Sequence, residues 1–220
     1  MATPARDPGV EMRDLRYTLL TDGASDRALL RILTWVLVEH LPDWAIQPEW
    51  ADLRLLPHPP RDLVGKINAA VAQYPCDLLF VHRDAETVRR EQRVKEIQEA
   101  KARCANPELL SICVVPVRMT EAWLLFDEQA IRYAAGNPSG TVPLAVPSDS
   151  FESIPDPKAV LHELLLTASE LTGRRKKRFQ PEQCVHQVAG RIEDFSPLRR
   201  LRAFLAMEHE LVSIIREKGW

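Results

Sequence analysis

The stretch LLFVHRDAE, residues 78–86, decides the fold class. Four apolar residues run directly into His82, Arg83, Asp84 and Glu86. An apolar run of this length is typical of a strand that is buried on both faces, as in a parallel sheet. Charged residues bunched at its carboxyl end indicate a site, because ligands of open α/β sheets bind beyond the carboxyl ends of the strands.

Strands and helices alternate on both sides of this stretch. We expect strands over 14–21, 49–57, 77–82 and 109–117, and helices over 23–40, 61–74 and 84–102. This alternation predicts an α/β protein with a mainly parallel sheet of about four strands, flanked by helices.

Beyond residue 118 the pattern becomes helical. We expect helices over 120–136, 157–173 and from Ser196 onward, with a Pro-, Ser- and Gly-rich loop over 137–157. The predicted organisation is a disordered lead-in (1–13), an α/β domain (14–126) and a helical C-terminal extension packed on it (127–220).

The composition limits the function classes. A chain of 220 residues with 45% hydrophobic content can bury one sizeable core. Its net charge of -2 excludes a protein that is basic throughout, as nucleic-acid coating proteins are. It has no apolar run of roughly 20 residues, the length that spans a bilayer. Four scattered cysteines without a CxxC pair favour reduced thiols and a cytoplasmic protein over a zinc cluster or disulfide framework. These are Cys76, Cys104, Cys113 and Cys184.

Metal-ligating side chains follow three of the predicted strands. They are Asp22 and Asp26 after the first, His82, Asp84 and Glu86 after the third, and Glu121 after the fourth. Acids that converge on one sheet edge repel each other unless a cation neutralises them. Oxygen ligands suit Mg²⁺ or Mn²⁺, and these ions serve phosphoryl chemistry. The alternative is that each acid only stabilises the start of a helix.

These motifs carry a resemblance. TDGASDRALL (21–30), followed by an apolar strand that ends in HRD, resembles the acidic pattern of the Toprim fold. The sequence is most similar to the Toprim modules of OLD-type nucleases and to small standalone Toprim-like bacterial proteins. The segments TEAWLL (120–125) and FSPLRRLRAFL (195–205) resemble the standalone proteins. The likeness covers about 15–126 as a fold and extends to about 210 as a standalone family.

The resemblance implies roles for individual residues. Asp22 takes the place of a family Glu, and Asp26 matches the second acid of that motif. His82 stands at the first Asp of an Asp-x-Asp pair, and Asp84 matches the second. Glu121 matches the acid of the EAW segment. Asp22 is one methylene shorter than Glu, and His82 is softer and less negative than Asp, so the implied site is a weakened one. Glu86 is expected to restore a charge if the chain turns suitably.

The implied function is metal-dependent phosphodiester cleavage, with Mg²⁺ or Mn²⁺ as cofactor and Asp22 and Asp84 as catalytic residues. OLD-type Toprim modules work beside an ATPase, so a separately encoded ATPase partner in antiphage defence is expected. The alternative is a catalytically silent subunit that regulates such an ATPase. A phosphatase is a third interpretation, but the sequence offers no clear nucleophilic Asp motif.

Basic residues point to a nucleic-acid contact. GRRKKRF (173–179) holds five consecutive cations, Arg174, Arg175, Lys176, Lys177 and Arg178, which would neutralise phosphates, while Phe179 would stack on a base. The alternative is a solvated surface loop. OLD-type nucleases use a lysine near their metals, and Lys158 is the catalytic candidate for contacting the scissile phosphate. The alternative for Lys158 is an ordinary exposed lysine.

Overall fold

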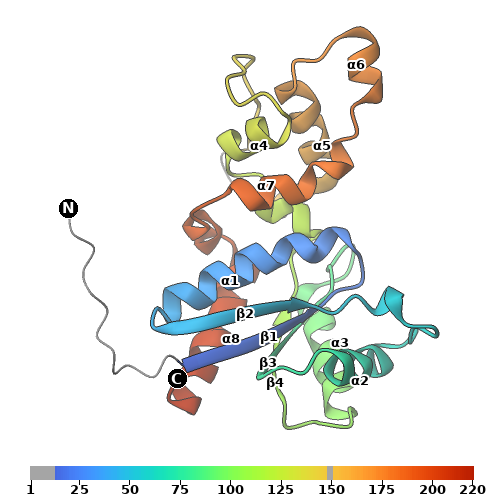
Figure 1. The fold of residues 1–220 in the computed structure, drawn as a ribbon, viewed down its shortest axis with the longest axis vertical. Helices are drawn as coiled ribbons and strands as arrows, with labels where there is room; N and C mark the ends of the chain where they lie inside the picture. The colour runs from blue at the N-terminus through green and yellow to red at the C-terminus, as the bar shows by residue number, and fades with distance from the viewer. Residues whose placement is uncertain (1–12, 148–150) are drawn as a thin grey trace.

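A computed structural model describes residues 13–147 and 151–220 (Figure 1). The predicted lead-in lies outside the described residues, except for Arg13, which begins the first strand. Four strands form one sheet in the order β2-β1-β3-β4, and every neighbouring pair is parallel. They are β1 (Arg13–Leu20), β2 (Trp44–Trp50), β3 (Leu78–His82) and β4 (Leu110–Val114). The predicted α/β class with a parallel sheet is confirmed.

Helices cover both faces of the sheet. Alternate residues of a strand point to opposite faces. Leu15, Tyr17 and Leu19 of β1 therefore join one buried cluster, while Leu20 joins another. The first cluster includes the buried faces of α1 (Leu29–His40) and α8 (Arg202–Lys218). The second includes those of α2 (Leu63–Gln73) and α3 (Arg90–Ala102).

The remaining helices form a helical portion at one end of the molecule (Figure 1). They are α4 (Glu128–Ala134), α5 (Pro157–Ala168), α6 (Gly173–Arg178) and α7 (Val185–Arg191). Ile131 of α4, Leu161 of α5 and Val188 of α7 are fully buried in the same cluster as α1 and α8. The helical portion therefore packs on the α/β portion through a continuous apolar core.

The second strand lies earlier in the sequence than predicted. The expected strand over 49–57 is wrong, because β2 ends at Trp50 and Leu53–Leu55 form a 3₁₀ turn. Leucines at 53 and 55 do not share a buried face, since Leu53 is 9% exposed and Leu55 is 77% exposed. β2 is an edge strand, and Pro48 is tolerated there because its missing N–H breaks no inner pairing.

The helix after β3 starts later than predicted. α3 begins at Arg90, not at Asp84, and the residues between β3 and α3 form a loop. The N–H groups of Ala85 and Glu86 donate to the carbonyls of Pro116 and Arg118, so this loop is bonded to the loop after β4. Glu86 and Arg118 both adopt left-handed backbone angles, with φ of 51° and 71°. Non-glycine residues in this conformation concentrate at functional sites.

Candidate functional site

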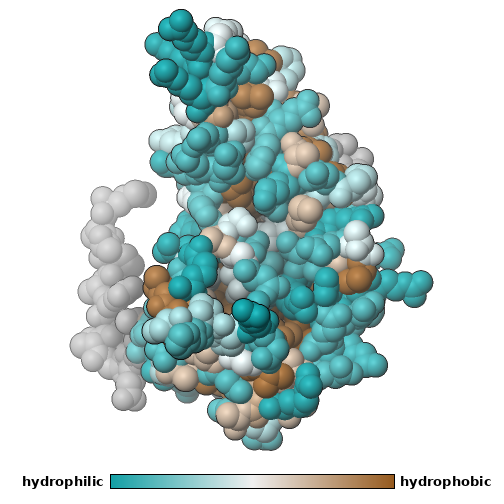
Figure 2. Space-filling view, turned by 90° about the vertical axis from the view of Figure 1, so that its right-hand side faces the viewer, coloured by the Kyte–Doolittle hydropathy of each residue, from teal (hydrophilic) through white to brown (hydrophobic). Residues whose placement is uncertain are grey.

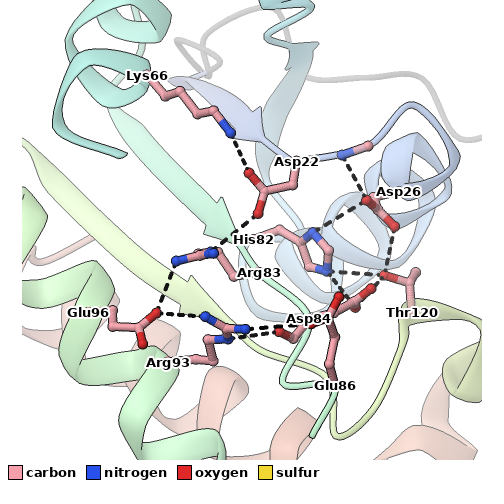
Figure 3. A network of polar contacts seen from close by, with 11 residues as sticks. Asp22, Asp26, Lys66, His82, Arg83, Asp84, Glu86, Arg93, Glu96 and Thr120 are labelled. Carbon is pink, nitrogen blue, oxygen red and sulfur yellow. Dashed lines mark hydrogen bonds and ion pairs between the residues drawn. The ribbon is translucent and has the colours of Figure 1, made fainter. Parts of the chain in front are cut away.

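The site lies where the sheet changes its order of connection. β2 lies on one side of β1 and β3 on the other, so the chain switches direction between β1 and β3. Ligand sites of open parallel sheets form at such a switch point, beyond the carboxyl ends of the strands. Leu20 pairs with Val81, and His82 pairs with Val114, so the three following loops emerge side by side. The polar side chains gathered there are Asp26, His82, Asp84 and Thr120 (Figure 3).

Asp26, His82 and Asp84 form a compact group of metal-ligating atoms, which we call the ligand cluster. One ligand atom from each lies within 4.8 Å of the other two. Two ligands of a Mg²⁺ ion, each about 2.1 Å from it, lie at most about 4.2 Å apart. A small inward movement of these side chains would therefore reach coordination distance. The Thr120 hydroxyl already ties the group together, with Oγ1 3.1 Å from Asp26 Oδ1 and 3.1 Å from His82 Nε2.

His82 has an unused buried nitrogen. Its side chain is 1% exposed, and Nε2 lies 3.1 Å from Asp84 Oδ1. Nδ1 has no hydrogen-bond partner among the described residues, and Asp26 Oδ2 lies 3.7 Å from it. Buried polar atoms are normally paired, so an orphaned ring nitrogen beside two carboxylates fits a metal ligand.

The two carboxylates of the ligand cluster repel each other when no cation neutralises them. Burial raises the pKa of Asp26, and the Asp84 carboxylate raises it further, against the opposing effects of His82, Thr120 and Gly23. Burial alone would lower the pKa of His82, but the bond to Asp84 and the surrounding acids outweigh burial and raise it. A protonated His82 and a bound cation are therefore alternative ways to neutralise the two carboxylates.

Glu121 lies beside the ligand cluster, in the 3₁₀ turn Thr120–Leu124. It is 5% exposed, and burial raises its pKa, with further contributions from Asp84 and Asp26. The opposing charge comes from Lys158, which is exposed near the start of α5. The structure thus brings both predicted residues into electrostatic range of the site, although neither belongs to the ligand cluster.

Asp22 points toward cations and not toward the ligand cluster (Figure 3). Its Oδ1 accepts a bond of 2.6 Å from Lys66 Nζ, and its Oδ2 accepts one of 3.2 Å from Arg83 Nε. Burial alone would raise the pKa of Asp22, but these two cations outweigh burial and lower it. Asp22, which was predicted as a metal ligand, is thus neutralised by protein side chains.

Glu86 does not add a charge to the ligand cluster. Its side chain is 61% exposed and lies 3.6 Å from Arg93 Nη2. Arg93 and Arg83 both bond Glu96 Oε2, at 2.9 and 3.0 Å. Arg93 Nε also donates to the carbonyl oxygen of Asp84 at 3.2 Å, so this ion-pair network fixes the backbone that carries the cluster.

The basic run is remote from the sheet. It forms the short helix α6, at the end of the helical portion farthest from the strands, where the surface is hydrophilic (Figures 1 and 2). All five cations are exposed, and within the described ranges none has a carboxylate within 4.0 Å. Glu170, the nearest preceding acid, accepts instead from the N–H groups of Thr141 and Val142. Phe179 is partly buried against the core, so its predicted stacking face is reduced.

The roles of three residues in the site were not predicted from the sequence. Thr120 directly precedes Glu121, and its hydroxyl beside an acid was a usable signal. Arg83 lies between two predicted ligands. Because β3 ends at His82, the Arg83 side chain can leave the sheet and reach Asp22. Lys66 gives no signal, since it is an ordinary polar position of α2 that lies 44 residues from Asp22.

Comparison with protein-family models, with curated proteins and with solved structures found no match. The resemblance to Toprim proteins therefore remains a prediction. Of the helices in the described residues, none combines the length and apolarity needed to cross a bilayer.

Proposed function

We propose that the protein is a metal-dependent phosphodiesterase that acts on nucleic acid, with Asp26, His82 and Asp84 as the metal ligands. The observation that carries the proposal is the convergence of these ligand atoms at the switch point of a parallel sheet. A bound Mg²⁺ or Mn²⁺ ion would polarise a phosphoryl oxygen and lower the pKa of a bound water. Thr120 would orient the ligands, and Glu121 and Lys158 would face the reacting phosphate from the helical side.

The expected activity of the isolated chain is low. Only two of the three ligands are carboxylates, so the site would hold Mg²⁺ weakly. It would hold Mn²⁺ more tightly, because Mn²⁺ accepts an imidazole nitrogen more readily. We expect weak cleavage with Mn²⁺, less with Mg²⁺, and most in the presence of an ATPase partner. An antiphage role with such a partner belongs to the same proposal.

Asp84→Asn tests the metal site. This change keeps the shape of a ligand but removes its charge, so we expect Mn²⁺ affinity, measured by calorimetry, to fall at least about tenfold and cleavage to be lost. Thermal unfolding in EDTA should show a folded variant with only a modest loss of stability, because Asp84 is bonded to His82 and Thr120 but is partly exposed at a strand end. Glu86→Gln is the matched control, since Glu86 lies two residues away and pairs with Arg93. Equal Mn²⁺ affinity in wild type and Asp84→Asn would place the metal elsewhere.

A catalytically silent subunit is the second candidate. The specific observation in its favour is internal neutralisation: Asp22 is paired with Lys66 and Arg83, and His82 lies between Asp26 and Asp84. A protein of this kind would show no saturable Mn²⁺ binding in calorimetry, with or without nucleic acid.

A further inference from the structure

A small cavity adjoins the site on the far side of Asp22. Its volume is about 100 Å³, and its walls come from the loop after β1, the end of β2 with the turn that follows it, and α2. The lining residues that matter here are Asp22, Gly23, Trp50, Arg54 and Lys66. Small-molecule pockets usually measure about 300 to 1,000 Å³, so this one suits a single small group.

Two cations and two acids line this cavity, and a further arginine lies beside it. Arg54 and Arg27 lie over the indole ring of Trp50, with guanidinium carbons 5.1 and 5.5 Å from its centroid. Of the residues that line the cavity, Lys66 and Arg54 are positive and Asp22 and Asp52 are negative, while Arg27 adds a cation on Trp50 without being part of the lining. Arg27 has no carboxylate within 4.0 Å in the part of the chain that the structure describes.

Lys66 is placed to change partners. Its ammonium is held by Asp22 Oδ1, but Asp22 has a second cation, Arg83, on its other oxygen. If Lys66 turned to an incoming anion, Asp22 would stay paired with Arg83, and its side chain is 43% exposed, so the exchange would leave no carboxylate without a partner or solvent. Arg54 is 63% exposed at its side chain, and its guanidinium bonds both carboxylate oxygens of Asp52.

We infer that this cavity binds a phosphate group of a nucleic-acid strand beside the ligand cluster, with Lys66 and Arg54 as donors and Asp22 as the residue that positions Lys66. A guanidinium and an ammonium are the usual partners of phosphate oxygens. The inference rests on the proposed function for the identity of the strand, but the binding itself needs no metal. The phosphate comes either from the interior of the strand or from a free 5′ end.

The test is binding in EDTA. Anisotropy of a fluorescent oligothymidylate is measured with the full chain, as wild type, Lys66→Gln and Arg54→Gln, over a series of salt concentrations. We expect each variant to bind about tenfold more weakly and to lower the slope of log K against log salt by about 0.7, the value of one single-strand phosphate contact. Lys95→Gln is the matched control, because Lys95 is an exposed lysine of α3. A 5′-phosphorylated and a 5′-hydroxyl strand distinguish the two sources.

Stronger binding of the phosphorylated strand, lost in Lys66→Gln, would assign the cavity to a 5′ end, and equal binding of both strands would assign it to an internal phosphate. Unchanged affinity and slope in both variants would overturn the inference, as would Lys66-dependent binding of inorganic phosphate without any effect on the strand. Strand binding is measured in EDTA, so it does not depend on a bound metal. Failure of cleavage with intact Lys66-dependent binding would therefore count against the phosphodiesterase alone.

Discussion

At the scale of single residues, His82 sets the character of the site. Its imidazole lies between Asp26 and Asp84, and the Thr120 hydroxyl bonds the same ring nitrogen as Asp84 does. Three carboxylates in this buried space would repel strongly without an ion, whereas an imidazolium stabilises the two that are present. Compared with a third carboxylate at this position, His82 makes the metal-free chain more stable but leaves the metal site with one negative ligand fewer.

His82→Asp should reverse this balance. A third acid at this position is expected to lower the free energy of unfolding in EDTA by about 1 to 3 kcal/mol, because buried like charges lack a partner. The same variant should bind Mg²⁺ more tightly than wild type, since ligand charge sets the affinity of oxygen sites. Thermal unfolding with and without Mg²⁺ checks both effects. His82→Asn is the control, and a His82→Asp variant that Mg²⁺ does not stabilise would show that the metal is not held there.

The sequence predicted the residues of the ligand cluster, but it did not show which of the two acids after β1 belongs to it. Asp22 and Asp26 are four residues apart, and both qualified as ligands. The 3₁₀ turn Ser25–Ala28 carries Asp26 toward His82, while Lys66 and Arg83 retain Asp22. These partners are distant in sequence, so no local pattern distinguishes the two acids.

At the scale of secondary-structure elements, hydrophobic patterning predicted most of the fold. β3 is buried along its whole length, β1 and β4 are buried toward their carboxyl ends, and all three lie within the predicted ranges to within a residue. The errors fall where tertiary bonds override local preference. The 83–89 loop is held by backbone bonds to 116–118, and the helix expected from Ser196 starts with a 3₁₀ turn before α8 begins at Arg202.

One buried carboxylate links the last helix to the first. Glu208 of α8 is 6% exposed, on a face that is otherwise apolar. It accepts bonds from Arg199 Nη2 at 2.8 Å and pairs with His40 Nε2 of α1 at 2.9 Å. Burial alone would raise the pKa of Glu208, but Arg199 and His40 outweigh burial and hold it below its ordinary value.

A lowered folded pKa contributes stability above the unfolded pKa of a glutamate, about 4.3, and this stability is lost as the pH falls through the folded value. We expect Glu208→Gln to reduce the free energy of unfolding by about 1 to 3 kcal/mol at neutral pH. The gap to wild type should shrink below about pH 4. Denaturant titrations across this range measure it. The control is Glu217→Gln, an exposed acid of the same helix, and a gap that is constant with pH would refute the pairing.

At the scale of the whole molecule, the basic run is separated from the candidate site. The basic run of α6 projects at the end of the helical portion, away from the sheet edge with the ligand cluster (Figure 1). A strand bound at both places would have to cross the helical portion. The sequence predicted that the run contacts phosphates, with a solvated surface loop as the alternative, but no pattern in it gave the distance between the run and the acids.

Changing Arg174, Arg175 and Lys176 to Ala tests this second contact. If all three touch phosphates of a duplex, the slope of log K against log salt should flatten by roughly 2 to 3 units, at about 0.9 for each contact. Cleavage at saturating nucleic acid should survive, because these residues do not hold the metal. Binding at several salt concentrations decides the matter, with Lys95→Ala as the control. An unchanged slope would assign α6 to solvent or to a protein partner.

The position of α8 has a consequence for synthesis on the ribosome. α8 packs against one face of the sheet. Its residues Phe204, Met207 and Leu211 are fully buried in the same apolar cluster as side chains of β1 and β3. This helix begins 88 residues after the end of β4 (202 minus 114). At about 5 to 20 residues per second, the completed sheet waits roughly 4 to 18 seconds for its cover. During that interval an apolar surface is open to solvent, so the nascent chain is a natural client for chaperones that bind exposed apolar segments.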